Sequence, residues 1–174
     1  PNGSDVAIAE RLPRVDDAPL RLAYIGRFTN ADKRVFDIPV LCEHMIQNGT
    51  PFQLTIVGAG PDEEELRSRL EPFRDHVEFI GMMKHDELYE TVFPNIDVLL
   101  LFSASESFGI VLAEAMMNGV VPVTSQYTGF FSERLVVDGT HGLSFPVGDM
   151  AAAAAAVARL HSETTLLKTL ANAA

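Results

Sequence analysis

Two glutamates near the middle of the chain are separated by seven residues, in the segment Glu106-Ser-Phe-Gly-Ile-Val-Leu-Ala-Glu114. The apolar run before them, 98–102, has the pattern of a buried strand, and residues 108–118 have the pattern of a helix. Glu106 is therefore expected in the loop at the carboxyl end of a strand, and Glu114 nearly two turns into a helix. At about 1.5 Å of rise per residue, the two carboxylates should lie about 12 Å apart along the helix axis.

The expected start of this helix lies between the two glutamates. Its first N–H groups have no partner within the helix, and they carry the positive end of the helix dipole. Gly109 lets a ligand approach that backbone closely. An anion held at the helix start, with hydroxyl groups bound on either side, corresponds to a sugar, a diphosphate and a ribose in line. The plain alternative is a helix cap at Glu106 and a solvated or core residue at Glu114.

Two cations follow the first strand pattern. Arg27 comes directly after Gly26, and Lys33 lies six residues further on. Both are expected at the carboxyl edge of the sheet, where a guanidinium and an ammonium could bind a diphosphate. Surface loops also carry cations without a ligand, so this pair alone does not identify a site.

A glycine-rich turn, Gly58-Ala59-Gly60-Pro61, looks like a dinucleotide fingerprint because it follows a strand and precedes a helix. The third glycine of that fingerprint would be residue 63, which is Glu63, and its carboxylate would repel a pyrophosphate. The sequence favours a tight turn here, with Gly58 lining a cleft.

Other chemistry finds little support. The five histidines and the single cysteine, Cys42, do not have metal-ligand spacing, so no metal is expected and each histidine is interpreted as structural or exposed. The serines at 103, 105 and 107 lack the frame of a hydrolase nucleophile. A formal net charge of −11 argues against nucleic-acid binding. One cysteine and no signal peptide or apolar span are consistent with a cytoplasmic protein.

Alternating patterns predict the elements that position these residues. The expected strands are 21–26, 53–57, 77–80, 98–102, 120–124 and 142–145. The expected helices are 35–47, 62–70, 86–91, 108–118, 130–136 and 149–171, with Pro61 opening the second, Gly119 ending the fourth and Asp149 capping the last. This order predicts a single α/β domain with a doubly wound, Rossmann-like parallel sheet, whose ligands bind at the carboxyl ends of the strands. Residues 1–19 are expected to be a linker from a missing N-terminal domain, and the chain, which begins at Pro1, a piece of a longer protein.

Taken together, these motifs resemble the C-terminal, donor-binding domain of family 4 retaining glycosyltransferases of the GT-B fold. The resemblance covers nearly the whole chain up to about Arg159. It is carried by Gly26-Arg27 with Lys33, by 57–61 and 77–81, and above all by the two glutamates in their strand–helix context.

The resemblance implies a role for each residue. Arg27 and Lys33 would hold the donor diphosphate and stabilise the leaving group, and Glu106 would contact sugar hydroxyls as the third catalytic residue. Glu114 would bind the ribose. The remaining expected donor-binding residues are Gly26, Gly58, Gly81, Met82, Leu88, Ser107, Phe108, Gly109 and Ile110, of which the loop 81–83 and Leu88 would flank the base and 108–110 would offer N–H groups. The domain would bind a nucleotide-sugar donor for transfer to an acceptor hydroxyl, with no cofactor and no metal. Membrane contact would be possible only through the missing acceptor-binding domain.

The chain departs from the family pattern in two places. Arg34 follows Lys33 where a glycine is usual, and Phe130 follows Gly129 where a second glycine is usual. A catalytically inactive binding module, or a sugar-nucleotide epimerase of the same fold, stays open as an alternative. A phosphorylase would need a lysine that binds pyridoxal phosphate, and neither Lys84 nor Lys168 has such a setting.

Overall fold

The computed structural model describes residues 15, 17–106 and 109–174. Six parallel strands form one sheet in the order β3-β2-β1-β4-β5-β6. The strands are β1 (Leu20–Ile25), β2 (Phe52–Val57), β3 (Val77–Gly81), β4 (Val98–Leu101), β5 (Val121–Ser125) and β6 (Leu143–Phe145). Each predicted strand is present, with its ends within one or two residues of the prediction. The doubly wound α/β fold is confirmed.

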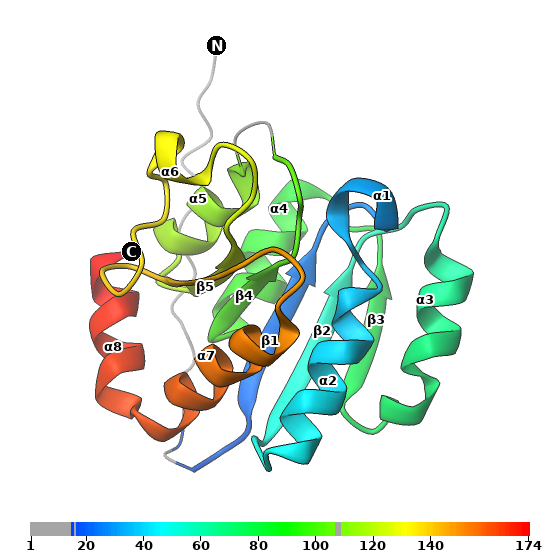
Figure 1. The fold of residues 1–174 in the computed structure, drawn as a ribbon, viewed down its shortest axis with the longest axis horizontal. Coiled ribbons are helices and arrows are strands. Elements are labelled where there is room, and N and C mark those ends of the chain that lie inside the picture. Colours follow the sequence, from blue (N-terminus) through cyan, green and yellow to red (C-terminus); the bar gives the residue numbers. More distant parts are fainter. Residues whose placement is uncertain (1–14, 16, 107–108) are drawn as a thin grey trace.

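Helices connect successive strands and lie on both faces of the sheet (Figure 1). They are α1 (Asn30–Lys33), α2 (Asp37–Gln47), α3 (Glu63–Leu70), α4 (His85–Glu87), α5 (Ile110–Met117), α6 (Phe130–Glu133), α7 (Met150–Ser162) and α8 (Thr164–Ala173). Three short helices complete the set: the 3-10 helix η1 (Glu71–Phe73), the π-helix η2 (Leu88–Val92) and the 3-10 helix η3 (Phe93–Asn95).

Two hydrophobic cores lie on the two faces of the sheet. The larger joins the strands to α2, α3, α7 and α8, and the smaller joins them to η2, η3, α5 and α6. All four residues of β4 are buried, as expected for a strand whose two faces are both covered. The sheet is therefore a rigid platform, and its carboxyl edge carries the loops that matter for function.

The chain reverses direction across the sheet between β1 and β4. From β1 it runs outward through β2 to β3, then returns to place β4 on the other side of β1. Ligands of doubly wound sheets bind at such a switch point, outside the carboxyl ends of the two strands. Arg27 and Lys33 follow β1 and Glu106 follows β4, so the topology brings both cations and this carboxylate to the same crevice.

Helix ends follow the expected capping chemistry at two positions. The Asp149 carboxylate accepts a hydrogen bond from the Ala152 N–H at 2.9 Å, which caps α7. Gly119, with a φ of 66°, ends α5, and its N–H and that of Val120 bond to the carbonyls of Met116 and Ala115. This is the Schellman arrangement, so both predicted caps are confirmed.

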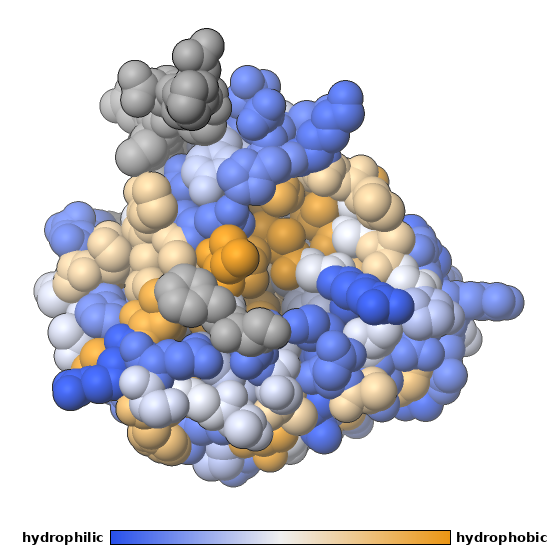
Figure 2. All heavy atoms as spheres, turned by 90° about the horizontal axis from the view of Figure 1, so that it is seen from above, coloured by the Kyte–Doolittle hydropathy of each residue, from blue (hydrophilic) through white to orange (hydrophobic). Residues whose placement is uncertain are grey.

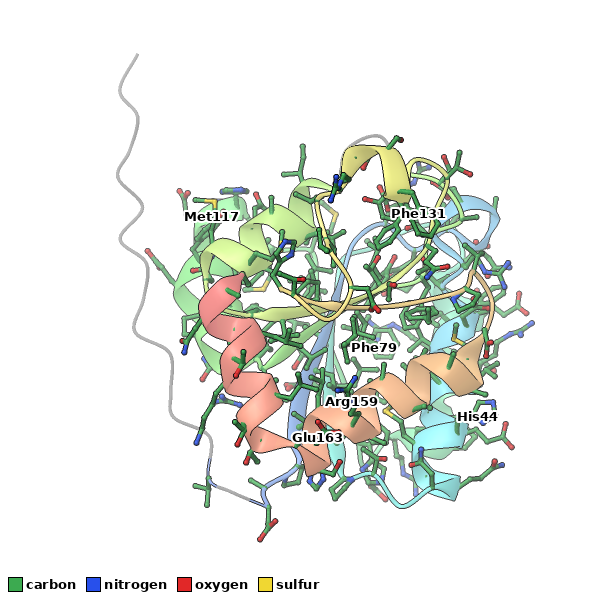
Figure 3. The ribbon with its side chains drawn as sticks, turned by 60° about the vertical axis from the view of Figure 1, so that its left-hand side comes forward. His44, Phe79, Met117, Phe131, Arg159 and Glu163 are labelled. Atoms are coloured by element: carbon green, nitrogen blue, oxygen red, sulfur yellow. The ribbon has the colours of Figure 1, made fainter. Side chains whose placement is uncertain are left out.

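Several helix predictions were wrong in detail. The region 149–171 is two helices, because the chain bends at Glu163, whose side chain pairs with Arg159 at 3.0 Å (Figure 3). Pro61 lies in a turn before α3 rather than in its first turn. The segment predicted as one helix at 86–91 is α4 followed by the π-helix η2. The short α1 was not predicted.

The predicted linker and the possibility of a membrane span can both be compared with the described residues. The expected linker 1–19 falls almost entirely outside the described residues, so its role stays a prediction. Within the described part of the chain, no helix has the length and apolar character that a membrane span requires.

Candidate functional site

A cavity of about 460 Å³ lies at the switch point. Its lining comes from the ends of β1 and β4, from α1 and α4, and from the first turns of α5: Tyr24, Ile25, Gly26, Lys33, His85, Leu101, Glu106, Gly109, Ile110, Val111 and Glu114. Figure 2, which looks onto this edge from above, shows a hollow with apolar residues in its floor and polar residues on its rim. The cavity holds one cation and both glutamates of the spaced pair.

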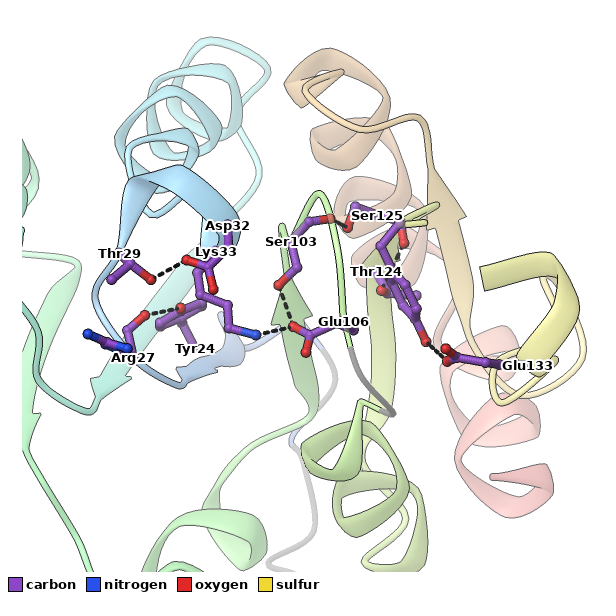
Figure 4. A network of polar contacts seen from close by, with 11 residues as sticks. Tyr24, Arg27, Thr29, Asp32, Lys33, Ser103, Glu106, Thr124, Ser125 and Glu133 are labelled. Atoms are coloured by element: carbon purple, nitrogen blue, oxygen red, sulfur yellow. Dashed lines mark hydrogen bonds and ion pairs between the residues drawn. The ribbon is translucent and has the colours of Figure 1, made fainter. Parts of the chain in front are cut away.

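Lys33 and Glu106 form an ion pair across the switch point. The Lys33 Nζ lies 2.7 Å from the Glu106 Oε1, and the same oxygen accepts a hydrogen bond from the Ser103 hydroxyl (Figure 4). The side chains are only 23% and 11% exposed. Ser125 in turn donates its hydroxyl proton to the Ser103 carbonyl at 2.6 Å. These contacts neutralise the charge of Lys33 and orient the Glu106 carboxylate.

Tyr24 forms part of the floor beneath this pair. Its hydroxyl donates to the Arg27 carbonyl at 3.0 Å. Burial raises the pKa of the Tyr24 phenol well above its usual value, and the nearby charge of Glu106 adds to the effect. The phenol therefore stays protonated and keeps the start of the β1–α1 loop in place.

Arg27 differs from Lys33 in being unpaired. Its side chain is exposed at the mouth of the cleft, and its guanidinium has no ion pair with any residue that the structure describes. The Arg27 guanidinium therefore lies in the loop before α1, and the paired Lys33 ammonium comes from the last residue of α1.

Glu114 occupies the other end of the cavity. Its side chain is 15% exposed, and its Oε1 lies 2.5 Å from the His85 Nε2. The partner that a half-buried carboxylate requires is thus supplied by a histidine that the sequence reasoning had left outside the site. The helix around Glu114 is less buried than predicted, since Ile110 and Met117 are 63% and 66% exposed.

A second cavity of about 420 Å³ continues the first on the side of β2 and β3. The two share Ile25 and Gly26, and the second is lined further by Arg27, Val57, Gly58, Ala59, Met82, Met83 and Leu88. Its walls are mostly apolar, and Met82 is 80% exposed on its rim. The two cavities together make one continuous cleft along the carboxyl edge.

The glycine turn after β2 is pressed against the end of β1. A Cβ at Gly58, whose φ is 138°, would lie 1.9 Å from the Gly26 carbonyl oxygen, and one at Gly60 would lie 2.3 Å from the Phe28 oxygen. The Phe28 N–H donates to the Ala59 carbonyl at 2.9 Å. These glycines serve the close packing of two loops, in agreement with the tight turn that the sequence favoured.

The structure brings most of the expected site residues together. Those that line the cleft are Gly26, Arg27, Lys33, Gly58, Met82, Leu88, Glu106, Gly109, Ile110 and Glu114. Gly81 lies just behind the cleft, where its carbonyl accepts a hydrogen bond from the Gly58 N–H at 2.8 Å. Ser107 and Phe108 lie outside the described residues. The described part of α5 begins at Ile110, after Gly109 in a left-handed conformation with a φ of 58°.

Sequence reasoning missed Tyr24 and His85. Tyr24 lies within a strand pattern, where an aromatic residue is ordinarily part of the core. His85 was treated as one of five isolated histidines, and only the fold brings it to Glu114. Its position next to the loop 81–83, which had been assigned to the cleft, was the one signal available. Across the described residues, no group of three or more His, Cys, Asp or Glu could hold a metal ion.

Both departures from the family pattern have structural consequences. Arg34 adopts a left-handed conformation, with φ 51° and ψ 42°, at the end of α1, where a glycine would be unstrained. Its guanidinium pairs with Asp37 at 2.7 Å. Phe130 is buried and packs against Tyr127, while Phe131 projects outward, 73% exposed (Figure 3). Glu133 accepts a hydrogen bond from the Tyr127 hydroxyl at 2.9 Å, so that this loop is closed on itself.

Comparison with known proteins gives a consistent result. A family described as "Glycosyl transferases group 1" matches residues 19–163. A phosphatidyl-myo-inositol mannosyltransferase from Mycolicibacterium smegmatis is 32% identical over 161 residues, which cover 90% of this chain and 41% of that protein. The chain thus spans about two fifths of the length of this curated relative.

Solved structures share the fold. The C-terminal domain of a glycosyl transferase group 1 family protein from Francisella tularensis has a TM-score of 0.79 at 16% identity, covering 98% of this chain and 94% of that one. The Anabaena protein HepE in complex with UDP and glucose has a TM-score of 0.74 at 19% identity, covering 89% of this chain and 42% of that one. These structures show the architecture of one GT-B half.

Proposed function

The chain belongs to the group 1 glycosyltransferases, and we propose that it is the donor-binding half of a retaining enzyme that transfers a sugar from a nucleotide-diphosphate sugar to an acceptor hydroxyl. One observation carries the proposal: two cations and two carboxylates line a single cleft at the switch point of the sheet. The complex of one structural neighbour with UDP and glucose supports the same ligand class.

The diphosphate lies between Arg27 and Lys33 in this proposal. Arg27 lies in the β1–α1 loop and Lys33 at the end of α1, and the start of α5 at Gly109 and Ile110 offers N–H groups on the opposite wall. Lys33 is paired with Glu106. It would exchange that carboxylate for phosphate oxygens when the donor binds.

Because of this exchange, we propose that Glu106 binds the sugar. Once Lys33 turns to the phosphate, the Glu106 carboxylate is available to accept hydrogen bonds from sugar hydroxyls, while Ser103 still holds it in place. Glu114, at the other end of the cavity, accepts from the ribose hydroxyls. The base then lies along the apolar second cavity, between Met82 and Leu88.

The chemistry needs stabilisation of a leaving group. The bond between the anomeric carbon and the diphosphate breaks, and negative charge develops on the phosphate oxygens. Preformed cations aimed at that charge lower the barrier without reorganising. We propose that Arg27 and Lys33 supply this stabilisation, that no bound metal is required, and that the acceptor is bound by an N-terminal domain.

This domain by itself should bind the donor without transferring the sugar. We also propose that the full protein acts in the cytoplasm. The single cysteine, Cys42, is buried and is not in a disulfide, which fits the reducing cytoplasm.

Calorimetry of this chain with UDP, GDP and ADP tests the proposal, followed by the matching nucleotide sugars. Glu114→Gln should weaken nucleoside diphosphate and nucleotide sugar alike, because both carry ribose. Glu106→Gln should weaken only the nucleotide sugar. Each loss should be about 1–3 kcal/mol, typical of a hydrogen bond to a charged group. The proposal fails if none of the three diphosphates binds at millimolar concentration.

A further inference from the structure

The Glu114 carboxylate is held by a segment that the proposed chemistry does not use. His85, the first residue of α4, places its Nε2 2.5 Å from the Glu114 Oε1. The His85 ring lies 4.9 Å from the ring of Tyr89, centroid to centroid. Both aromatic residues come from the connection after β3, so a separate element of the fold reaches across to α5.

This segment is anchored firmly although His85 itself is 59% exposed. Tyr89 is 8% exposed and packs edge-on against Phe93, with ring centroids 5.2 Å apart. Before the helix, the Lys84 N–H donates to the Glu87 carboxylate at 2.9 Å, which caps the first turn. The buried end of the segment therefore fixes the exposed imidazole.

The helical geometry here is unusual. Three residues of α-helix pass directly into the π-helix η2, which carries Tyr89 and the cleft residue Leu88. Single π-turns inside helices occur often at functional sites, because the extra residue redirects side chains. The local geometry directs His85 and Tyr89 to the same carboxylate.

The electrostatics agree with this geometry. Burial raises the pKa of the Tyr89 phenol, and the charge of Glu114 and a hydrogen bond to it add to the rise. The phenol is thus a proton donor next to the carboxylate. A carboxylate can accept about four hydrogen bonds on its two oxygens, so the bonds from His85 and Tyr89 leave capacity for hydroxyl groups of a ligand.

We propose that His85 is a positioning residue for Glu114: it donates a hydrogen bond to Oε1 and so presents Oε2 to the ribose hydroxyls of the donor. This inference rests on the proposed function, since it takes Glu114 as the ribose-binding group. It adds a consequence for specificity. A carboxylate whose Oε2 accepts from two vicinal hydroxyls separates ribonucleotides from 2′-deoxyribonucleotides, because the deoxy ligand leaves one of the two acceptor positions of Oε2 unfilled.

The experiment compares dissociation constants for UDP, GDP and ADP with those for their 2′-deoxy counterparts, measured by calorimetry. The native protein should bind the ribo form at least about tenfold more tightly, the value of one hydrogen bond to a charged group. His85→Ala should reduce that ratio to about threefold or less. His85→Gln, which retains an N–H donor, should restore most of it.

His44→Ala serves as the matched control, since His44 lies on α2, on the other face of the sheet (Figure 3). It should leave the ratio unchanged. Thermal melting of each variant shows whether the fold is intact, and a ratio measured on folded protein is insensitive to a general loss of stability.

The possible outcomes distinguish a failure of the proposed function from a failure of the positioning role of His85. If no diphosphate binds the native protein, the proposed function fails and the inference fails with it. If diphosphates bind but His85→Ala keeps the native ratio, or lowers both affinities equally, the positioning role of His85 is wrong while the proposed function stands. If His85→Ala binds ribonucleotides more tightly, His85 blocks Glu114 instead of orienting it, which also overturns the proposal.

Discussion

The floor of the cleft is made of two loop systems that are held in place by different means. Where β1 and β2 end, backbone packs on backbone: the Gly26 N–H donates to Val57 at 3.0 Å, and Gly60 lies so close to Phe28 that a Cβ would overlap its main-chain atoms. Where β4 ends, backbone bonds of Ala104 to Asp32 and Thr128 are joined by side-chain contacts, chiefly the Lys33–Glu106 pair and the Ser103 hydroxyl.

The first region determines the shape of the cleft, and the second supplies the groups that can bind a ligand. The first region has little freedom to change, so we expect its contacts to remain the same when a ligand binds. The second region is held by groups that can exchange a protein partner for a ligand partner. We therefore expect substitutions in the first to lower the free energy of unfolding, and substitutions in the second to lower ligand affinity.

The largest effect is expected at Gly60. In Gly60→Ala the new methyl group would lie 2.3 Å from the Phe28 oxygen and 2.6 Å from its nitrogen, so the two loops must separate. The free energy of unfolding should fall by about 3 kcal/mol or more, as for severe overpacking. Urea denaturation measures the change.

Gly49→Ala provides the control for Gly60. Gly49 has a φ of 72° but no neighbour within 4 Å, so only backbone strain opposes the substitution, at about 1 kcal/mol. Equal losses for the two variants would show that the β1–β2 contact is not held by steric fit.

Lys33→Ala should have the opposite profile. It removes a proposed phosphate contact, so the affinity for nucleoside diphosphate should fall by about 1.5–3 kcal/mol, as for a lost charge-assisted hydrogen bond. The free energy of unfolding should change by about 1 kcal/mol or less, because Ser103 still donates to Glu106. Lys168→Ala, at an exposed position on α8, should alter neither quantity. If Lys33→Ala greatly lowers the free energy of unfolding and leaves the affinity unchanged, Lys33 stabilises the fold and does not bind the ligand.

Tyr24 lies in the floor of the cleft, and the stability of the protein at alkaline pH tests whether its phenol is buried there. The folded state raises the pKa of this phenol, so the folded state retains a proton that the unfolded chain loses above about pH 10. Its contribution to stability is therefore complete below pH 10 and declines as the pH rises further, by about 1.4 kcal/mol per pH unit.

Tyr24→Phe should remove that share of the decline. The pKa of Tyr127 is also raised, by burial and by its bond to Glu133, but Tyr127 is present in both proteins and cancels from the difference. Urea denaturation between pH 9 and 11 measures the two slopes. If the free energy of unfolding falls with the same slope in both proteins, the folded state does not raise the pKa of Tyr24.

The smallest effect is expected for Arg34→Gly. The change relieves a left-handed conformation that costs about 1–2 kcal/mol in a residue with a side chain, but it loses the pair with Asp37 and adds flexibility to the unfolded chain. We expect a net change in the free energy of unfolding within about 1 kcal/mol. Arg34→Ala, which loses the pair and keeps the strain, should be less stable than Arg34→Gly.

Sequence patterns were sufficient for the sheet because each strand is a short apolar run with turn residues at its ends. β4, for example, is buried on both faces and could be recognised without knowledge of its neighbours. The two spaced glutamates likewise indicated a loop and a helix face. The break at Glu163 was missed because no glycine or proline marks the bend, although the neighbouring Ser162, Thr164 and Thr165 are weak helix formers.

The candidate site was predictable only in part, for the same physical reason. Arg27, Lys33 and Glu106 could be assigned to one edge because parallel strands place their carboxyl ends together. Contacts between residues far apart in sequence, such as Lys33 with Glu106 and His85 with Glu114, depend on side-chain packing across loops. Local periodicity does not carry that information, so the partner of each glutamate emerged only from the structure.

The Arg27 guanidinium, which forms no ion pair among the described residues, has a consequence for the rate at which a ligand binds. The chain carries a formal net charge of −11, which repels a nucleoside diphosphate at long range. Lys33 is already neutralised by Glu106, so the exposed Arg27 at the cleft mouth provides the local attraction. Association should therefore quicken as added salt screens the overall repulsion, and the loss of Arg27 should slow the encounter most at low ionic strength.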